Sequence, residues 1–462
     1  MTRAATHPAD GGSLPGHVRA TLVLGLPLVG SHLAQFATKI TDTVMLGWYG
    51  VEPLAAAVLG STMFFLLFLL GAGFSQAVMP LVASASAGEA VALARRVTRR
   101  GMWLSLLFAA AMMPLMWWSE AVFLALGQDP AVSALAQDYL RIAGWGLGPA
   151  LLVMVLKSFL AALERTSWVL WVTVAAAVLN ALINYAFIFG NWGAPELGVR
   201  GAAIASLGTQ TATILVLGGY VILARDFRPY TLFARFWRAD WGAFAQVFRL
   251  GWPIGLTLLA EVGLFSATSI MVGWIGTREL AAHGIAIEIT AAFFMIHLGL
   301  ANAATVRIGR ARGAADGAGL RQAARAGGLL TLVVAGASMT VFVAFPEFLV
   351  GLFLDPSDPA RPAIVAIGAA LLLVAAIFQL ADGAQVMALG LLRGIQDTRV
   401  PMLMAAFAYW GVGAPASYFF GFILGFGVTG VWWGLIAGLA AAGILMTWRF
   451  LRLLPSAMTK PA

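Results

Sequence analysis

Long apolar tracts, separated by short polar or Gly/Pro-containing breaks, fill most of the chain. The tracts run to roughly 20 to 30 residues, which as α-helices are long enough to cross a ~30 Å hydrocarbon core. They are rich in glycine and alanine and lack the alternating ~10-residue segments typical of barrel strands. The pattern therefore predicts twelve membrane-spanning helices, at residues 18–48, 52–84, 100–126, 131–162, 167–190, 199–224, 242–275, 279–308, 320–350, 362–393, 398–424 and 428–450.

The composition supports this assignment. Hydrophobic residues make up 61% of the 462 residues and charged residues only 10%, with a mean hydropathy of +0.90. In a soluble domain about a quarter of the residues are charged, so a soluble globular fold is excluded. The absence of cysteine excludes disulfides, thiol catalysis and Cys-ligated metal sites.

Basic residues gather on one side of the predicted spans. With the N-terminus inside, 22 of the 28 Lys and Arg lie in cytoplasmic segments, four lie outside, and two, Lys39 and Lys157, lie within spans. Because Lys and Arg concentrate on the cytoplasmic side, we expect a multi-pass protein of the bacterial inner membrane with both termini cytoplasmic. This sorting also accounts for the net charge of +8, so we expect no nucleic-acid partner. Separately, we expect the protein to be a monomer in the lipid bilayer.

The chain contains an internal repeat at a constant offset, without a gap. Residues 24–56 read LGLPLVGSHLAQFATKITDTVMLGWYGVEPLAA, and residues 250–282 read LGWPIGLTLLAEVGLFSATSIMVGWIGTRELAA, so that Pro27 matches Pro253. Each copy carries six spans, an even number, so both copies enter the membrane in the same orientation. We therefore expect an all-α membrane protein with two pseudo-symmetric six-helix bundles around a central cleft, an arrangement that suits alternating access.

The repeat also sets the predicted domain boundaries. The N-terminal lobe covers residues 18–224 and the C-terminal lobe residues 242–452, joined by a cytoplasmic connector at 225–241. Residues 1–17 and 453–462 are expected to be cytoplasmic tails. Because 1–17 has no apolar stretch like that of a cleavable signal peptide, the first apolar helix is expected to remain in the mature protein.

Ionisable side chains inside a span are costly in hydrocarbon and indicate functional sites. Glu261 lies near the middle of the seventh span, and no basic residue stands within a helical turn of it in the sequence. A carboxyl group in a low-dielectric interior favours its neutral form. We therefore expect Glu261 to hold a proton near neutral pH and to lose it to a cationic substrate or to Na⁺, unless it only hydrogen-bonds a neighbouring helix. Its repeat counterpart, Gln35, is a further binding candidate.

The tenth span carries a second acid. Spacing places Phe378, Asp382 and Gln385 on one helical face, and we take all three as candidates for binding the ion or the substrate. A hydrogen bond that only packs two helices is the alternative role for Asp382. Glu288, about nine residues from the outer end of the eighth span, is another candidate.

The N-terminal half has its own polar set. Asp42 lies in the outer part of the first span, and Lys39 stands three residues earlier on the same face, where an ion pair would keep the carboxyl charged. Asn180 and Asn184 share one face of the fifth span. They are candidates for binding substrate or ion, although interhelical hydrogen bonding explains intramembrane asparagines equally well.

Histidines and a lysine complete the intramembrane polar residues. His32, His283 and His297 could relay protons because imidazole titrates near neutrality, but we favour hydrogen-bonded packing for them. Lys157 stands near the cytoplasmic end of the fourth span, where its ammonium group can reach the membrane surface. We interpret it as structural.

Four short segments occur in an order and spacing that are typical of one family. They are Thr41–Gly47 (TDTVMLG), Pro195–Ala203 (PELGVRGAA), Ala304–Gly309 (ATVRIG) and Leu392–Thr398 (LRGIQDT). With them the chain resembles the multidrug and toxic compound extrusion (MATE) transporters, in their NorM-like branch, over about residues 18–452. The resemblance implies secondary active efflux of cationic or amphipathic drugs in exchange for H⁺ or Na⁺, with no cofactor beyond the coupling ion.

The resemblance also implies roles for single residues. Glu261 and Asp382 match the two acids of the C-terminal lobe that bind the coupling cation, and Asp42 matches the aspartate of the first helix. Sodium-coupled members of the family that this chain resembles have a tyrosine one helical turn before the second acid, whereas this chain has Phe378. A phenyl ring offers no hydroxyl ligand, so Na⁺ at Glu261 and Asp382 remains an option but H⁺ is favoured.

Two other functions compete with efflux. A flippase for lipid-linked sugars or polymers, from the same superfamily, would need a cleft lined by Arg or Lys to hold phosphates, but the intramembrane set here is mainly acidic. A membrane-embedded enzyme could use the run Asp355–Asp358 (DPSD) as a metal-diphosphate site. That run is expected on the outer side, where a turn before the next helix explains it better, so we expect no enzyme.

Overall fold

In the computed structural model, which describes residues 13–85 and 90–459, every regular element is helical. Eleven described helices are long and apolar enough to cross a membrane. They are α1 (Leu14–Tyr49), α2 (Val51–Ala83), α3 (Ala90–Trp117), the run from α5 (Pro130–Ala143) through a 3₁₀ turn to α6 (Leu147–Ala162), α7 (Thr166–Phe189), α8 (Val199–Leu223), α9 (Trp241–Ile275), α10 (Thr277–Gly313), α11 (Gly317–Ala344), α13 (Arg361–Gly394) and α16 (Gly427–Thr459). The predicted all-α membrane fold is confirmed.

The remaining predicted span, 398–424, is helical but irregular. It consists of α14 (Arg399–Ala406), a π-helix η4 (Phe407–Gly413), α15 (Ala414–Tyr418) and a second π-helix η5 (Phe419–Ile423). The i→i−5 bond from the Leu424 amide to the Phe419 carbonyl, 3.0 Å long, shows the wider turn. Pro415 has no amide hydrogen to donate and sits between the two π segments. Such segments inside α-helices are frequently found at functional sites.

Several ends of the predicted spans were wrong by up to ten residues. The third span begins at Ala90 rather than at residue 100, because its arginine-rich start continues the helix. The first helix begins at Leu14 and the last continues to Thr459, so most of the described part of each predicted tail is helical. Residues 1–12 and 460–462 of those tails lie outside the described residues. Two short helices, α4 (Ser119–Ala125) and α12 (Pro346–Gly351), form the last parts of the predicted third and ninth spans.

The chain packs as two compact units. The C-terminal unit combines residues 257–462 with the chain up to Val29, as far as these are described, and the N-terminal unit is Gly30–Leu256. Helices α1 and α9 therefore contribute to both units. They divide at nearly equivalent positions of the repeat, shortly after Pro27 and Pro253. The lobes predicted from the repeat, 18–224 and 242–452, stay a prediction.

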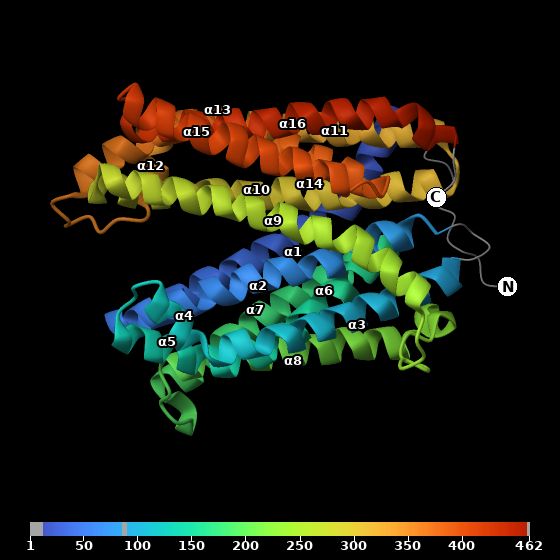
Figure 1. Ribbon diagram of the computed structural model, residues 1–462, viewed down its shortest axis with the longest axis horizontal. Coiled ribbons are helices and arrows are strands. Elements are labelled where there is room, and N and C mark those ends of the chain that lie inside the picture. Colours follow the sequence, from blue (N-terminus) through green and yellow to red (C-terminus); the bar gives the residue numbers. More distant parts are fainter. Residues whose placement is uncertain (1–12, 86–89, 460–462) are drawn as a thin grey trace. The chain divides into compact units, whose positions relative to one another are not determined.

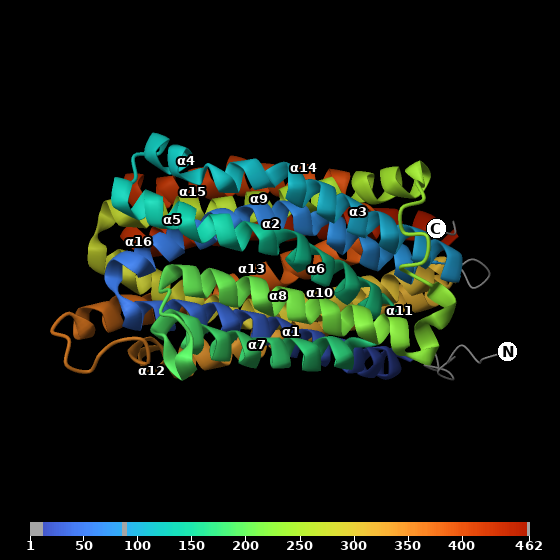
Figure 2. The same ribbon diagram turned by 90° about the horizontal axis from the view of Figure 1, so that it is seen from below.

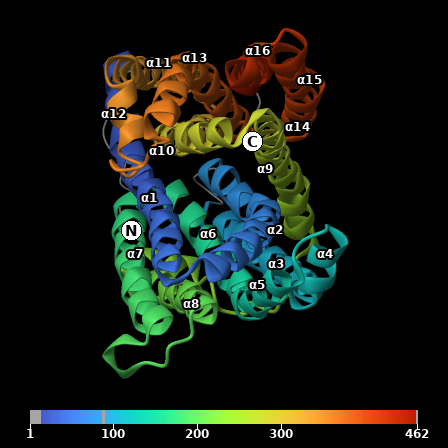
Figure 3. The same cartoon turned by 90° about the vertical axis from the view of Figure 1, so that its left-hand side faces the viewer.

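Each unit has its own helix packing. In the C-terminal unit α13 packs most extensively against α10, α16 and α11 (Figures 1 and 3). Its core includes the fully buried Trp432, Tyr409, Phe342 and Phe378. In the N-terminal unit α7 runs along α8, and α2 packs against α3, α5 and α6 (Figure 2).

The pairs Asp129-Pro130 and Asp355-Pro356 open a helix and a turn, and for Asp355 the sequence predicted such a turn. The Asp129 carboxylate accepts hydrogen bonds from the amides of Ala131 and Val132, at 2.9 and 3.2 Å, and so caps α5. Asp355 accepts from the Ser357 amide at 2.8 Å in the turn that precedes α13. These carboxylates satisfy backbone donors, which accounts for the Asp-Pro sequence without a metal site.

The basic start of α3 holds the connector that follows α8. Arg99 donates to the carbonyl oxygens of Leu232, at 2.6 Å, and Thr231, at 2.5 Å. Arg100 donates to the Arg238 carbonyl at 2.7 Å, and the Trp103 indole donates to the Phe236 carbonyl at 3.0 Å. These basic side chains therefore anchor the connector to the N-terminal unit.

An ion pair fixes the end of this connector. Arg96 donates two hydrogen bonds to Asp240, Nε to Oδ2 at 2.5 Å and Nη2 to Oδ1 at 3.2 Å, while Asp240 also accepts from the Ala243 amide at 3.1 Å at the start of α9. The bonds from Arg96, with smaller help from the Ala243 amide, hold the pKa of Asp240 below its usual range.

Replacing Asp240 by asparagine is expected to lower the free energy of unfolding at pH 7 by about 0.5 to 1 kcal/mol, since the pair is partly exposed. A carboxyl whose pKa is depressed on folding stabilises the protein above its unfolded pKa and loses this effect as the pH falls through the folded value. The wild type should therefore lose stability below about pH 4 more than the variant does. Thermal unfolding in detergent at several pH values measures both quantities. Equal stability of the two proteins at pH 7 would refute the assignment.

Candidate functional site

Two buried acids approach each other in the C-terminal unit. Glu261 stands on α9 with 8% of its surface exposed, and Asp382 stands on α13 with 3% exposed. They lie close enough for their carboxyl groups to interact electrostatically. Two carboxylates in a low-dielectric interior repel each other strongly, so the pair favours a state in which a cation or a proton reduces its charge.

The face of α13 that carries Asp382 is buried along its length. Phe378, one turn earlier, packs edge-on against Trp432 and Phe265, with ring centroids 5.5 and 6.1 Å apart. Gln379 donates from Nε2 to the Thr290 carbonyl of α10 at 3.2 Å. The aromatic rings shield this side of the acid pair from water, and Phe378 belongs to that apolar layer.

A tyrosine from the irregular helix completes the group. Tyr409 lies in η4, is fully buried, and its Oη accepts a hydrogen bond from Gln385 Nε2 at 2.7 Å. Tyr409 also interacts electrostatically with both Glu261 and Asp382. The hydroxyl that is absent at position 378 is thus present nearby, on a different helix.

A positive charge also reaches the site. Arg393, near the end of α13, is 8% exposed and interacts electrostatically with Glu261 and Tyr409. The sequence prediction that counted Arg393 only among the cytoplasmic charges was incomplete. No basic residue stands near Glu261 along its own helix. The packing of α13 within the unit places Arg393, from a distant part of the chain, near Glu261.

Several acceptor atoms of this group have no hydrogen-bond partner among the described residues. They are Asp382 Oδ1, Gln385 Oε1 and Gln379 Oε1, all buried. Buried acceptors without a donor are unfavourable. Carboxylate, amide and phenol oxygens are the ligands that a hard cation prefers, and a carboxylate can equally take a proton. The arrangement is therefore suited to binding one small cation, H⁺ or Na⁺, in reversible fashion.

The histidines of the C-terminal unit differ in their surroundings. His283 accepts from Trp432 Nε1 at Nδ1, 3.0 Å away, and its Nε2 lies 3.1 Å from Ser269 Oγ, in keeping with the predicted packing role. His297 is fully buried with its ring against Gly383, directly after Asp382. Neither nitrogen of His297 has a hydrogen-bond partner in the described part of the chain.

A second polar group lies in the N-terminal unit. Asn184 donates from Nδ2 to Asp42 Oδ1 at 2.5 Å and to Asn180 Oδ1 at 3.1 Å. Both asparagines are buried and Asp42 is half-buried. The ammonium group of Lys39 lies over the Phe36 ring, 5.9 Å from its centroid. The structure thus joins Asp42 to the asparagine pair by a direct hydrogen bond.

The other predicted residues are more dispersed. Gln35 is exposed on α1, and Glu288 is half-buried on α10 of the C-terminal unit. The described residues contain no group of three or more His, Asp or Glu side chains arranged to hold a metal ion. The structure therefore brings together Glu261, Asp382 and Gln385 in one unit, and Asp42, Asn180 and Asn184 in the other.

Sequence reasoning missed Tyr409 and Arg393. A tyrosine inside an apolar span was a usable signal, since the chain has only seven tyrosines. Arg393 gave no such signal, because an arginine at the end of a span is what the charge rule expects of any membrane protein.

A family profile and curated relatives match this chain over most of its length. Residues 27–186 and 253–419 match the profile of the MatE family, and the two matches begin at the equivalent repeat positions Pro27 and Pro253. The curated "Probable multidrug resistance protein NorM" of Rhizobium meliloti (strain 1021) is 47% identical over 97% of this chain and 96% of the relative. The protein of the same name from Agrobacterium fabrum is 43% identical over 98% of both chains.

Solved structures give the same picture of the fold. The structure described as "Outward-facing conformation of a multidrug resistance MATE family transporter of the MOP superfamily" aligns with a TM-score of 0.87 at 20% identity, over 96% of this chain and 97% of that one. The eukaryotic MATE transporter AtDTX14 aligns with a TM-score of 0.82 at 16% identity, over 96% and 99% of the two chains. At these identities the likeness concerns the fold.

Proposed function

Because this chain belongs to the MatE family, we propose that it is a multidrug efflux transporter that exports cationic or amphipathic compounds in exchange for inward H⁺ or Na⁺. The observation that carries the proposal is the buried pair Glu261 and Asp382, with the unpartnered oxygen of Asp382. A soluble ligand or a reaction intermediate would not require two acids in this apolar interior, whereas the exchange of a cation would require them.

The cation acts by changing the charge of the pair. When H⁺ or Na⁺ binds, the repulsion between the Glu261 and Asp382 carboxyl groups falls, and the state that buries them is stabilised. When the cation leaves, either a cationic drug must bind in its place or the carboxyl groups must become exposed to water. Each net positive charge that moves inward per cycle also gains ~2.3 kcal/mol per 100 mV of membrane potential. This cycle links the ion gradient to alternating access without any direct contact between ion and drug.

The groups around the pair set its charge and shape. Arg393 supplies a fixed positive charge next to Glu261, so that one bound monovalent cation neutralises the remaining excess of negative charge. Gln385 orients the Tyr409 hydroxyl through its 2.7 Å hydrogen bond. For H⁺ the hydroxyl stabilises whichever carboxylate is ionised, and for Na⁺ it is a further oxygen ligand.

We assign the polar group of the N-terminal unit a separate task. Asp42, linked to Asn184, offers a negative charge beside two amides that can both donate and accept hydrogen bonds. Such a surface fits the positively charged or polar end of a drug molecule. The proposal further places the protein in the bacterial inner membrane as a monomer, with both termini in the cytoplasm.

Reconstitution in proteoliposomes tests the proposal. Export of a fluorescent cation such as ethidium is followed first with an imposed pH gradient and then with an imposed Na⁺ gradient at constant pH. We expect the pH gradient, or failing that the Na⁺ gradient, to drive dye against its own concentration difference. Transport that responds to neither gradient would overturn the exchange mechanism.

Replacing Tyr409 by phenylalanine is expected to weaken cation binding about tenfold while leaving the maximal transport rate largely intact, since the hydroxyl that interacts electrostatically with both acids is lost. The measurement is the dependence of dye transport on the pH or on the Na⁺ concentration, which should shift in the variant. Tyr418→Phe is the matched control, because Tyr418 lies in the same helical run but is 47% exposed. If the two variants show the same cation dependence, Tyr409 has only a packing role.

A further inference from the structure

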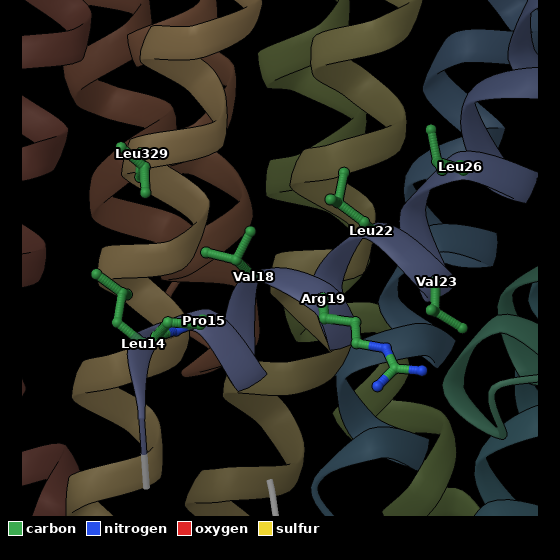
Figure 4. Close-up of a pocket in the computed structure, with 8 residues that line it drawn as sticks. All are labelled: Leu14, Pro15, Val18, Arg19, Leu22, Val23, Leu26 and Leu329. Atoms are coloured by element: carbon green, nitrogen blue, oxygen red, sulfur yellow. The ribbon is translucent and has the colours of Figure 1, made fainter. Parts of the chain in front are cut away.

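An apolar groove runs along the first half of α1 and reaches α11 (Figure 4). It has a volume of about 450 Å³, and all its lining residues belong to the C-terminal unit. Leu14, Val18, Leu22 and Leu26 form its floor along α1, and Leu329 contributes from α11. The only charged residue in the lining is Arg19.

The floor of the groove has the length of one membrane leaflet. The four floor residues recur every fourth position on α1, so they form one stripe along the helix. The twelve helical steps from Leu14 to Leu26 span roughly 18 Å at 1.5 Å per residue, and half of the ~30 Å hydrocarbon core is about 15 Å. Leu26 and Leu329 are 59% and 43% exposed, whereas Leu14, Val18 and Leu22 are half-buried, so the stripe is covered only in part by the described chain.

One arginine lines the groove and a second follows from its helix α11. Arg19 is exposed at the groove, and Arg325 is exposed one helical turn before Leu329 on α11. Neither guanidinium has a salt bridge or hydrogen bond among the described residues. Guanidinium groups bind phosphate with two parallel hydrogen bonds, and anionic lipids are concentrated in the cytoplasmic leaflet.

We propose that this groove is a binding site for an anionic phospholipid of the cytoplasmic leaflet, with an acyl chain on the leucine stripe and the phosphate at Arg19 and Arg325. The assignment rests on the cytoplasmic position of the N-terminus. Residues 1–12 are an unsuitable occupant by composition, because Met1 is the only large apolar side chain among them. A lipid bound here stabilises the first half of α1 against the rest of the C-terminal unit.

Native mass spectrometry of the delipidated full-length protein tests the site. The probes are phosphatidylglycerol and phosphatidylcholine with identical acyl chains. We expect one phosphatidylglycerol to bind more tightly than phosphatidylcholine, and Arg19→Gln or Arg325→Gln to weaken it about fivefold each. Val18→Trp, which fills the groove, should weaken both lipids. Arg399→Gln, an exposed arginine at the start of α14, is the charge control and should change neither.

Three results would overturn the site. One is equal binding of the two lipids by the wild-type protein. Another is retention of phosphatidylglycerol by the Arg19→Gln and Val18→Trp variants at the wild-type level. The third is tighter lipid binding after deletion of residues 1–12, which would mean that the chain itself occupies the groove. Because lipid binding is measured directly, none of these outcomes depends on the transport mechanism.

Discussion

Proteins carrying Glu261→Gln or Asp382→Asn are expected to insert into the membrane normally and to lose at least about tenfold of their gradient-driven dye transport. Each change keeps the shape of the side chain but removes the carboxylate that takes up the cation, so the repulsion that cation binding relieves no longer exists. Because the two acids interact, loss of either one should disable the pair. The measurement is ethidium transport in everted vesicles under an imposed ion gradient, normalised to the amount of protein.

The control for this prediction is Glu347→Gln. Glu347 is exposed on α12, so the same chemical change there should leave transport unchanged. Monodisperse elution of every variant shows that the loss is not one of folding. Full transport by both the Glu261 and the Asp382 variants would remove the acid pair from the mechanism.

The largest expected effect on folding comes from Gly434→Leu. Helices α15 and α16 approach so closely that any Cβ on Gly434 would overlap the backbone of Ser417. Backbone cannot move aside as a flexible side chain can, so the helices must separate, and the hydrogen bond from Ser417 Oγ to the Val431 carbonyl, 3.0 Å long, is then lost. Overpacking typically destabilises a protein by about 1 to 3 kcal/mol, and we expect the upper end of that range or more.

The yield of monodisperse protein and its unfolding temperature in detergent measure this effect. Gly336→Leu on α11 is the matched control, because nothing lies within 4 Å of a Cβ at that exposed glycine. We expect a sharp fall in folded protein for the first variant and none for the second. A Gly434→Leu protein with the yield and unfolding temperature of the wild type would mean that the two helices are not held this closely.

The length of the apolar tracts predicted the helices of this protein well, because a helix must be long enough to cross the hydrocarbon core. A backbone in lipid must satisfy its own hydrogen bonds, so an apolar tract long enough to cross the membrane forms a helix. The repeat was visible for the same reason, since equivalent spans keep glycines and prolines at equivalent places, as at Pro27 and Pro253. Helix ends were less predictable, as at Ala90, because arginines that continue a helix outside the membrane look like a loop.

The site was predictable only where the functional side chain itself is unusual in a membrane. Glu261 and Asp382 are conspicuous as intramembrane acids, and the spacing of Asn180 and Asn184 indicated a shared face. Tyr409 stood out as a tyrosine in an apolar span, but its place beside the acid pair was not predictable because it lies in the π-helix η4. A wider helical turn depends on packing against neighbouring helices, and no local pattern of residues predicts it.

The reciprocity of coupling offers the most direct test of the central claim. If an ion gradient can drive drug export, a drug gradient must drive the ion in the opposite direction. Proteoliposomes with no initial ion gradient and an imposed ethidium gradient, loaded with a pH-sensitive or Na⁺-sensitive dye, report this movement. We predict opposing movement of H⁺ or Na⁺ with the wild-type protein and none with Asp382→Asn. Protein-dependent movement of ethidium without opposing movement of either ion would contradict the account.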